Sequence, residues 1–368
     1  MRIDDRAIAR WRFRSQLFEG RHASHTAEAV STLLGVQAEN LGQTAWALAC
    51  RTTGREARLD ELLADATLIR THVLRTTWHL VHRDDAAWLV ELTGPRIRRL
   101  AGQQLSRDHG VSETEADRIG EVVSAALAEA PGRTREELAT VIADAGCTLS
   151  STTLMVLLVR LAGDGLICSG SPRVEGPTAT QTYALLAARV PPSPYSSREE
   201  ALGTLAARYF TGHGPATERD LAYWATLPLG DVRKGIAAAA GELASFDHDG
   251  RTFWHAADQE PPQAPRKPVA HLLHLLDEWY RGYQDSRMVV DTAGHHPRGR
   301  EPGLGLAVID GQIAGLAART VTDRGLHFEV RPYRQLSASE LAALTEEAGA
   351  YGRFLDLPAT LTLAPHSR

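Results

Sequence analysis

The chain has 368 residues, of which 43% are hydrophobic and 23% are charged, and its formal net charge is −5. This composition is typical of a globular protein with two or three domains, and it excludes a chain that is disordered throughout. The acidic balance argues against a protein that coats nucleic acid indiscriminately, because such binding needs many phosphate contacts, but it leaves room for a local basic groove. Since neither a signal peptide nor an apolar run of membrane-spanning length is found, we expect a cytoplasmic protein.

The first part of the chain, residues 1–110, predicts helices followed by a pair of strands. Hydrophobic spacing places three helices near 5 to 19, 25 to 35 and 58 to 66, and two strands near 69 to 74 and 77 to 82. This succession permits a winged helix, although the pattern is weaker than in the two units that follow.

Between the second and third of these helices lies the segment Gly35-Val36-Gln37-Ala38-Glu39-Asn40. Gln37 and Glu39 flank one apolar residue, so in an extended segment both side chains would point the same way. An amide and a carboxylate aimed at one point can hold a water molecule. The alternative interpretation is a solvated loop or helix end.

The two strands contain Arg70, His72, Arg75 and His79 within the segment 70 to 80. Their alternation predicts a strand whose polar face could contact DNA phosphates, and we take these four residues as candidates for DNA binding. The alternative, equally well supported, is a sheet surface with hydrogen-bonded threonine and histidine side chains.

Residues 111–190 predict a winged helix. A helix at 114 to 130 ends at Pro131-Gly132, and Thr134 with Glu137 forms the capping box of a second helix. A third helix runs from 151 to 164. Two strands at 166 to 169 and 181 to 186 can then pair as a hairpin.

The same succession returns in residues 191–262, after the linker Pro191-Pro192-Ser193-Pro194. Helices are predicted at 198 to 210, 217 to 224 and 228 to 240, and residues 246 to 254 alternate about an Asp-Gly turn, which is a hairpin signal. This is a second winged helix.

Residues 263–368 have a different pattern. Two apolar strands, 304 to 309 and 312 to 319, meet at Asp310-Gly311, a third strand follows at 325 to 330, and Ser337 with Glu340 caps a helix that extends to about residue 354. The prediction for the whole chain is therefore an α+β protein in which tandem winged-helix units precede a C-terminal domain resembling a β-barrel.

No metal site or cofactor is predicted. Cys50, Cys147 and Cys168 are odd in number and widely separated, without the spacing of a zinc site or a disulfide framework. His271 and His274 lie on one face of a predicted helix but have no third ligand at a convincing spacing. A nucleotide-binding loop is also missing, because no phosphate-binding motif has a strand before it and a helix after it.

Several motifs, taken in this order, resemble the winged-helix DNA glycosylases, the AlkZ-like and YcaQ-like proteins. They are the Gln37-Ala38-Glu39 segment, the stretch from Arg70 to Val81, Gly212-His213-Gly214-Pro215-Ala216-Thr217, Asp277-Glu278 with Asp285-Ser286-Arg287, and Asp310-Gly311. The resemblance spans nearly the whole chain. It implies a concave DNA-binding channel formed by tandem winged helices and a C-terminal barrel.

The resemblance also implies a function. Gln37 matches the first position of the family's catalytic Gln-x-Gln or Gln-x-Asp motif, and Glu39 occupies the second, where glutamate departs from that pattern. We therefore expect a monomeric, monofunctional glycosylase that removes N7-alkylguanine or bulkier alkylated purines from double-stranded DNA, in base excision repair or self-resistance. A lysine nucleophile is not expected, because Lys234 and Lys267 are remote from the motif in sequence.

The charged residues of the fourth motif and the candidate recognition helices allow two further interpretations. Asp277, Asp285 and Arg287 are expected to form internal ion pairs rather than to act in catalysis. The alternative function for the whole chain is a non-enzymatic winged-helix transcription regulator. Its candidate recognition helices, however, offer only Arg160, Arg233 and Lys234 as long basic side chains, which argues against it.

Overall fold

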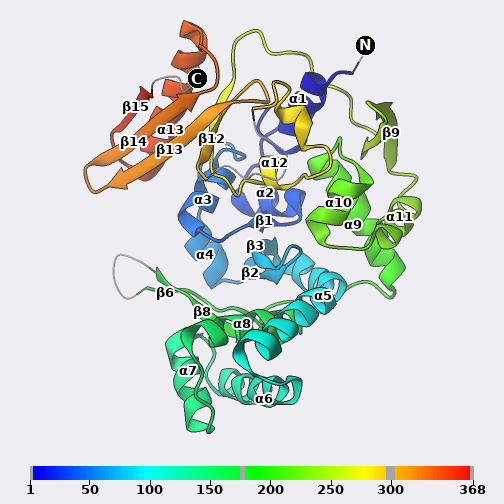
Figure 1. The fold of residues 1–368 in the computed structure, drawn as a ribbon, viewed down its shortest axis with the longest axis vertical. Coiled ribbons are helices and arrows are strands. Elements are labelled where there is room, and N and C mark those ends of the chain that lie inside the picture. Colours follow the sequence, from blue (N-terminus) through cyan, green and yellow to red (C-terminus); the bar gives the residue numbers. More distant parts are fainter. Residues whose placement is uncertain (1–2, 175–178, 296–302, 365–368) are drawn as a thin grey trace.

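The computed structural model describes residues 3–174, 179–295 and 303–364. It confirms a mixed α+β chain, elongated along one axis, with the C-terminal sheet near one end and the helices between residues 113 and 163 at the other (Figure 1). In these parts of the chain, no helix is long and apolar enough to span a membrane.

The N-terminal elements surround a small antiparallel sheet of order β1-β3-β2. They are α1 (Asp5–Ser15), α2 (Thr26–Leu33), β1 (Val36–Gln37), α3 (Leu41–Ala49), α4 (Leu59–Ala64), β2 (Leu68–Val73) and β3 (Thr77–His82). The two predicted strands are confirmed as β2 and β3. Helix α3 and the short strand β1, which pairs Gln37 with His79, were not predicted.

A long helix, α5 (Arg83–His109), connects this sheet to the next unit and was also not predicted. Proline and glycines interrupt its hydrophobic pattern, with Pro95 inside the helix. Gly94 has a packing role: a Cβ atom added there would lie 2.3 Å from the carbonyl oxygen of Gly163, the last residue of α8 (Ser151–Gly163). The two helices therefore cross with their backbones in direct contact.

The predicted elements of residues 111–190 are confirmed. The helices are α6 (Glu113–Glu129), α7 (Arg135–Asp144) and α8 (Ser151–Gly163), and a sheet of order β4-β8-β5 contains β4 (Arg133–Thr134), β5 (Ile167–Ser169) and β8 (Thr182–Leu185). The strands β6 (Arg173–Val174) and β7 (Ala179–Thr180) and the 3-10 turn η1 (Leu186–Ala188) complete the unit. Thr134 and Glu137 form the predicted capping box.

The elements predicted after the proline-rich linker are also found. They are α9 (Arg198–His213), α10 (Glu218–Ala225), α11 (Leu229–Ala238) and a hairpin of β9 (Leu243–His248) and β10 (Arg251–Ala256). At the hairpin turn, Asp249 and Gly250 both have positive φ, as this tight turn requires.

The C-terminal part is an open sheet covered by a helix. Its elements are β11 (Ala270–Leu273), α12 (Glu278–Arg281), the 3-10 turn η2 (Arg287–Val290), β12 (Gly305–Ile309), β13 (Gln312–Thr322), β14 (Gly325–Pro332), α13 (Ala338–Leu355) and β15 (Ala359–Leu363). The sheet order is β11-β12-β13-β14-β15, and no pairing between the outer strands closes it within the described residues. The expected barrel is therefore not found, and His271 lies on a strand rather than a helix.

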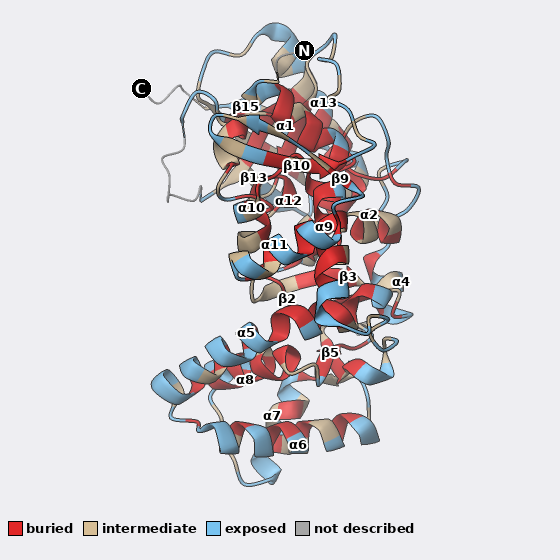
Figure 2. Cartoon of the chain, turned by 90° about the vertical axis from the view of Figure 1, so that its right-hand side faces the viewer, coloured by how far each residue is buried: buried red, intermediate tan, exposed pale blue. Residues whose placement is uncertain are grey.

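The N- and C-terminal parts share one hydrophobic core. Trp46 of α3 stacks on Tyr351 of α13 with ring centroids 4.1 Å apart, and its Nε1 donates a hydrogen bond of 3.2 Å to the carbonyl oxygen of Leu272 in β11. Phe13 of α1 joins the same core. Buried residues consequently run along the long axis of the molecule, whereas the outer faces of α6 and α7 are exposed (Figure 2).

Candidate active site

The Gln37-Ala38-Glu39 segment is the connection between α2 and α3, held against β3. The Ala38 backbone N–H donates to the carbonyl oxygen of Trp78 at 2.7 Å, and the Ala38 side chain is buried. Asn40 then caps α3, because its side chain accepts a hydrogen bond of 3.0 Å from the Gln43 backbone N–H. The backbone of the segment is thus fixed on both sides.

Gln37 lies deep in the structure, with 5% of its surface exposed. Its backbone N–H donates to Glu278 Oε1 at 3.0 Å, and its carbonyl oxygen accepts from Thr44 Oγ1 at 3.1 Å. Its side-chain Oε1 lies 3.4 Å from Arg75 Nη2. The surroundings of Gln37 are therefore polar and pre-arranged.

Glu278, at the start of α12, is the centre of these surroundings and is fully buried. Its Oε1 also accepts from Arg75 Nη2 at 3.0 Å, and its Oε2 accepts from Trp224 Nε1 at 2.8 Å. Burial alone would raise the pKa of this carboxyl group, but the Arg75 guanidinium, together with His213 and His79, outweighs burial and holds the pKa well below its usual range. Glu278 is thus a buried carboxylate with a matched cation.

Glu39 has different surroundings from Gln37, because its side chain is exposed. Its Oε1 accepts a hydrogen bond of 3.1 Å from the Trp78 backbone N–H, which leaves the other oxygen for a ligand. Glu39 lies on the wall of a cavity of about 430 Å³ between the N-terminal sheet, α5 and α8. A carboxylate at the edge of a cavity can accept a proton from a bound water molecule.

Most of the cavity wall is apolar or aromatic. Leu100 of α5 and Met155 of α8 are 39% and 51% exposed, which is unusual for such large hydrophobic side chains. Beside Glu39, the polar lining includes Gln104, Arg135 and Gln181. The remaining lining residues are His72, Thr76, Trp78, Ile97, Ala101, Val156, Leu158, Val159 and Tyr183. The cavity can therefore enclose an apolar or planar group while presenting a carboxylate to it.

Three of the four candidate DNA-binding residues, Arg70, His72 and His79, are buried, and the side chain of the fourth, Arg75, is only 8% exposed. Arg70 donates from Nε to the Ala38 carbonyl oxygen at 3.0 Å and contacts Gln181, and its guanidinium lies 4.5 Å from the centroid of the Trp78 ring. Arg75 is paired with Glu278. His72 and His79 bind backbone carbonyl oxygens at 3.2 and 2.9 Å. In the free chain these side chains support the motif, and their contact with DNA stays a prediction.

The histidines near the site are neutral at pH 7. Burial lowers the pKa of His72 to about 4 and that of His79 to about 3. Burial also lowers the pKa of His213, whose Nε2 lies 3.8 Å from Glu278 Oε2. The positive charge next to Gln37 therefore comes from Arg75.

Gln37 and Glu39 lie against the same hairpin, but no hydrogen bond joins their side chains in the described structure. Both contact the β2–β3 hairpin, Gln37 through Arg75 and Glu39 through Trp78. Among the described residues, however, Gln37 is not on the wall of the cavity that Glu39 lines. That the two side chains share one water molecule stays a prediction.

Glu278 and Trp224 were not identified from the sequence as parts of this site. The sequence interpretation assigns Asp277 to an internal ion pair and gives Glu278 no role of its own. For Asp277 that interpretation is confirmed, because its Oδ1 lies 2.7 Å from Nη2 of Arg51 and both side chains are buried. Asp285 accepts from Thr217 Oγ1 and lies 3.5 Å from Arg251 Nε.

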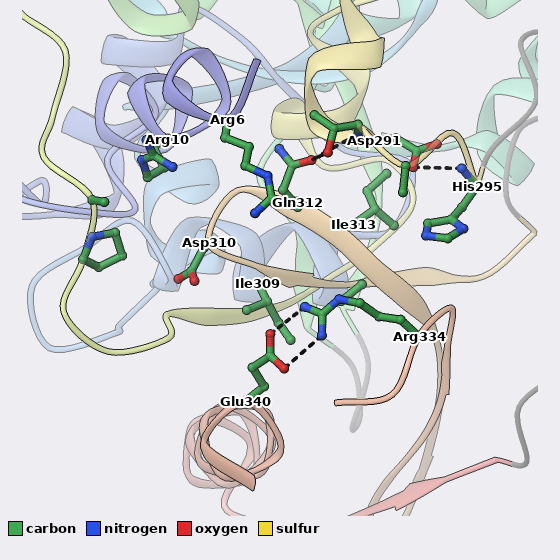
Figure 3. A pocket seen from close by; sticks show the side chains of 15 residues that line it. Arg6, Arg10, Asp291, His295, Ile309, Asp310, Gln312, Ile313, Arg334 and Glu340 are labelled. Atoms are coloured by element: carbon green, nitrogen blue, oxygen red, sulfur yellow. Dashed lines mark hydrogen bonds and ion pairs between the residues drawn. The ribbon is translucent and has the colours of Figure 1, made fainter. Parts of the chain in front are cut away.

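A second cavity, of about 230 Å³, lies between α1 and the β12–β13 turn and is lined by neither Gln37 nor Glu39 (Figure 3). Arg6, Arg10 and Arg334 line it, but acidic side chains line it too, and Arg334 is paired with Glu340 at 2.5 Å. The described residues contain no group of three or more His, Cys, Asp or Glu side chains arranged to hold a metal ion. The cavity beside Glu39 is therefore the better candidate for the active site.

Comparison with known proteins finds similarity to one family and to the fold of a solved structure. Residues 30–354 match the family described as DNA glycosylase AlkZ-like. No curated protein matches significantly. Among solved structures, the Streptomyces sahachiroi DNA glycosylase AlkZ is similar, with a TM-score of 0.76 and 22% sequence identity over 99% of this chain and 100% of that chain. At this identity the likeness shows a shared fold.

Proposed function

The chain belongs to the AlkZ-like DNA glycosylase family, and on that basis we propose that it hydrolyses the N-glycosidic bond of alkylated purines in double-stranded DNA. Membership makes the protein a DNA glycosylase of DNA repair. The observation that carries the finer proposal is Glu39, an exposed carboxylate on the wall of a largely apolar cavity.

The chemistry suits these residues. A purine alkylated at N7 or N3 is positively charged, so it leaves as a neutral base without prior protonation. The enzyme then has to stabilise an oxocarbenium-like sugar and deliver water to C1′. Glu39 supplies negative charge and accepts the proton of the water, while Gln37 orients the water through its amide.

The cavity supports a substrate with a substituent larger than methyl. Leu100 and Met155 offer apolar surface to such a group, and Trp78 and Tyr183 offer aromatic surface. No lysine lines this cavity, so the water-dependent, monofunctional reaction is favoured over a Schiff-base mechanism.

We include in the proposal that residues 111–190 and 191–262 act as winged helices on duplex DNA, with residues 1–110 as a related N-terminal unit and 263–368 as a β-rich C-terminal unit. The contacts of the arginines argue against a base-reading regulator. Arg160 is buried and contacts Asp117, and Arg233 is paired with Glu218 at 2.7 Å.

Release of free N7-alkylguanine from alkylated duplex DNA tests the proposal. The wild-type protein should release the base, and Gln37→Ala and Glu39→Ala should each slow release by about 100-fold or more. Glu121→Ala, which removes an exposed carboxylate from α6, should release base at the wild-type rate. A wild-type protein that releases no base, or a fully active Glu39→Ala variant, would contradict the mechanism.

A further inference from the structure

Arg75 connects the buried carboxylate of Glu278 to the side chain of Gln37. Its Nη2 donates to Glu278 Oε1 at 3.0 Å and lies 3.4 Å from Gln37 Oε1, while its Nη1 donates to the carbonyl oxygen of Arg281 at 3.2 Å. The arginine side chain is 8% exposed and the Glu278 side chain is fully buried. The guanidinium is therefore held from two sides by groups within the protein.

This contact determines which end of the Gln37 amide is available. A guanidinium has only hydrogen-bond donors, so the amide atom that faces it must be the carbonyl oxygen. The amide nitrogen, Nε2, then points away from Arg75, and no hydrogen bond joins it to any residue in the described parts of the chain. Gln37 consequently presents an N–H donor on the side of its amide that faces away from Arg75.

We infer that Arg75 is a positioning residue that fixes the Gln37 amide so that Nε2 donates to the oxygen of the attacking water. This assignment deepens the proposed glycosylase mechanism and rests on it. Glu39 accepts one proton from the same water, the water oxygen bonds to C1′, and the electron pair of the breaking C1′–N bond leaves with the cationic purine, which becomes neutral. Gln37 and Glu39 thus have opposite hydrogen-bonding roles.

Arg75→Met and Arg75→Lys test the role of the arginine. With Arg75→Met, the amide of Gln37 can rotate, so the single-turnover rate of 7-methylguanine release should fall about 100-fold. Arg75→Lys retains a donor and a charge and should recover part of this loss. DNA affinity and its dependence on salt should match the wild type for both variants, because Arg75 does not contact DNA in this assignment.

A direct contact between Arg75 and DNA would give a different result. If Arg75 contacts a phosphate, Arg75→Met will weaken DNA binding for all sequences. The slope of the logarithm of DNA affinity against the logarithm of salt concentration will also fall by about the amount of one phosphate contact. That result, or an unchanged rate of base release, would overturn the inference.

A folding control is needed because Arg75→Met leaves the Glu278 carboxylate buried without its cation. The double variant Arg75→Met/Glu278→Gln removes both charges. Its thermal midpoint should recover towards the wild-type value while its rate stays low. A rate that recovers together with stability would overturn the inference. Arg208→Met, which removes a half-buried arginine paired with Asp85, should lower stability without lowering the rate beyond that effect.

Gln37→Glu tests the donor directly. A glutamate at this position can still face Arg75 but has no N–H group, so it should fold and nevertheless lose activity as severely as Gln37→Ala. Full activity would overturn the inference. The two levels of the proposal are separable: wild-type protein that releases no base contradicts the function, whereas an active wild type with unaffected Arg75→Met contradicts only the role of Arg75.

Discussion

At the scale of single residues, Gln37 and Glu39 differ in how firmly they are held. Gln37 is buried and contacts Arg75, Thr44 and Glu278, while the exposed Glu39 carboxylate accepts one hydrogen bond from the residues that the structure describes, that of the Trp78 N–H. A fixed amide and a more accessible carboxylate suit the roles proposed for them, because the group that accepts a proton also has to exchange it with solvent.

Glu39→Gln separates positioning from proton transfer. The amide oxygen of the new side chain can still accept the hydrogen bond from Trp78, but it cannot accept a proton from water at neutral pH. We expect near-normal DNA binding and a single-turnover rate of base release that is reduced by at least about 100-fold. Unchanged release would show that Glu39 does not act as a base.

The buried histidines make stability depend on pH. The folded-state pKa values of His72 and His79, about 4 and about 3, lie below the value of about 6.5 in the unfolded chain. Each neutral histidine therefore makes its full contribution to the free energy of unfolding above pH 6.5. This contribution is lost as the pH falls towards the folded-state pKa values. At pH 5 the loss is about 2 kcal/mol for each histidine.

Urea unfolding at pH 7 and pH 5 measures this effect. The wild type should lose more free energy of unfolding between these two values than His79→Gln, which has no proton to bind. The interval lies above the ordinary range of carboxyl groups. Equal losses in the two proteins would show that His79 does not contribute.

At the scale of elements, the crossing of α5 and α8 depends on glycine. Gly94→Ala should destabilise the protein by about 1–3 kcal/mol, because the new Cβ would overlap the Gly163 carbonyl oxygen. Gly102→Ala is the matched control in the same helix: nothing lies within 4 Å of its added Cβ, so it should stabilise by about 0.5–1 kcal/mol. Thermal unfolding checks both signs, and a neutral Gly94→Ala would refute the close crossing.

The apolar side chain of Met155 on α8 should affect substrate choice. Met155→Ala removes apolar surface from the cavity, so the specificity constant for N7-benzylguanine should fall by roughly ten-fold while that for N7-methylguanine changes little. Val321→Ala, at an exposed position on β13, is the control and should change neither. Equal effects on both substrates would argue against contact between the cavity and the substituent.

Local signals explain which elements the sequence could predict. Thr134 and Ser337 form capping boxes, and Asp310-Gly311 supplies the positive φ values of a tight turn, so each signal lies within a few residues of the structure it specifies. Helix α5 was missed because Pro95 and its glycines resemble breaks. The predicted barrel is not found among the described strands, because closure of a barrel depends on pairing between strands that are far apart in sequence.

The same reasoning applies to the candidate site. The resemblance identified Gln37 and Glu39, and β3 holds both. The role of Glu278 was not predictable, because it acts on Gln37 across 241 positions of sequence. Likewise, the alternation around Arg75 indicated an exposed polar face, whereas its actual partner lies 203 positions away.

At the scale of the whole molecule, the hydrophobic clusters depend unequally on the C-terminal part. The cluster that contains Leu127, Leu138 and Leu157 is formed by residues between 101 and 183, with partly buried neighbours such as Trp78. The cluster around Trp46 instead combines α1 and α3 with the C-terminal sheet and α13. The two parts should therefore respond differently when the chain is shortened.

A chain that ends at residue 265 tests this difference. It should lose the near-ultraviolet circular dichroism that arises from Trp46 against Tyr351, and it should release no base. The helices of residues 111–190 should nevertheless remain, as a fragment that resists limited proteolysis. A shortened chain with full activity would contradict the dependence of the motif on the C-terminal part.

The hydrogen bond from the Gln37 backbone to Glu278 has a consequence for synthesis on the ribosome. Gln37 is translated 241 positions before its partner, so the nascent chain contains the motif long before the hydrogen bond to Glu278 can form. We therefore expect the enzyme to become active only after Glu278, in the last third of the chain, has emerged and folded against Gln37.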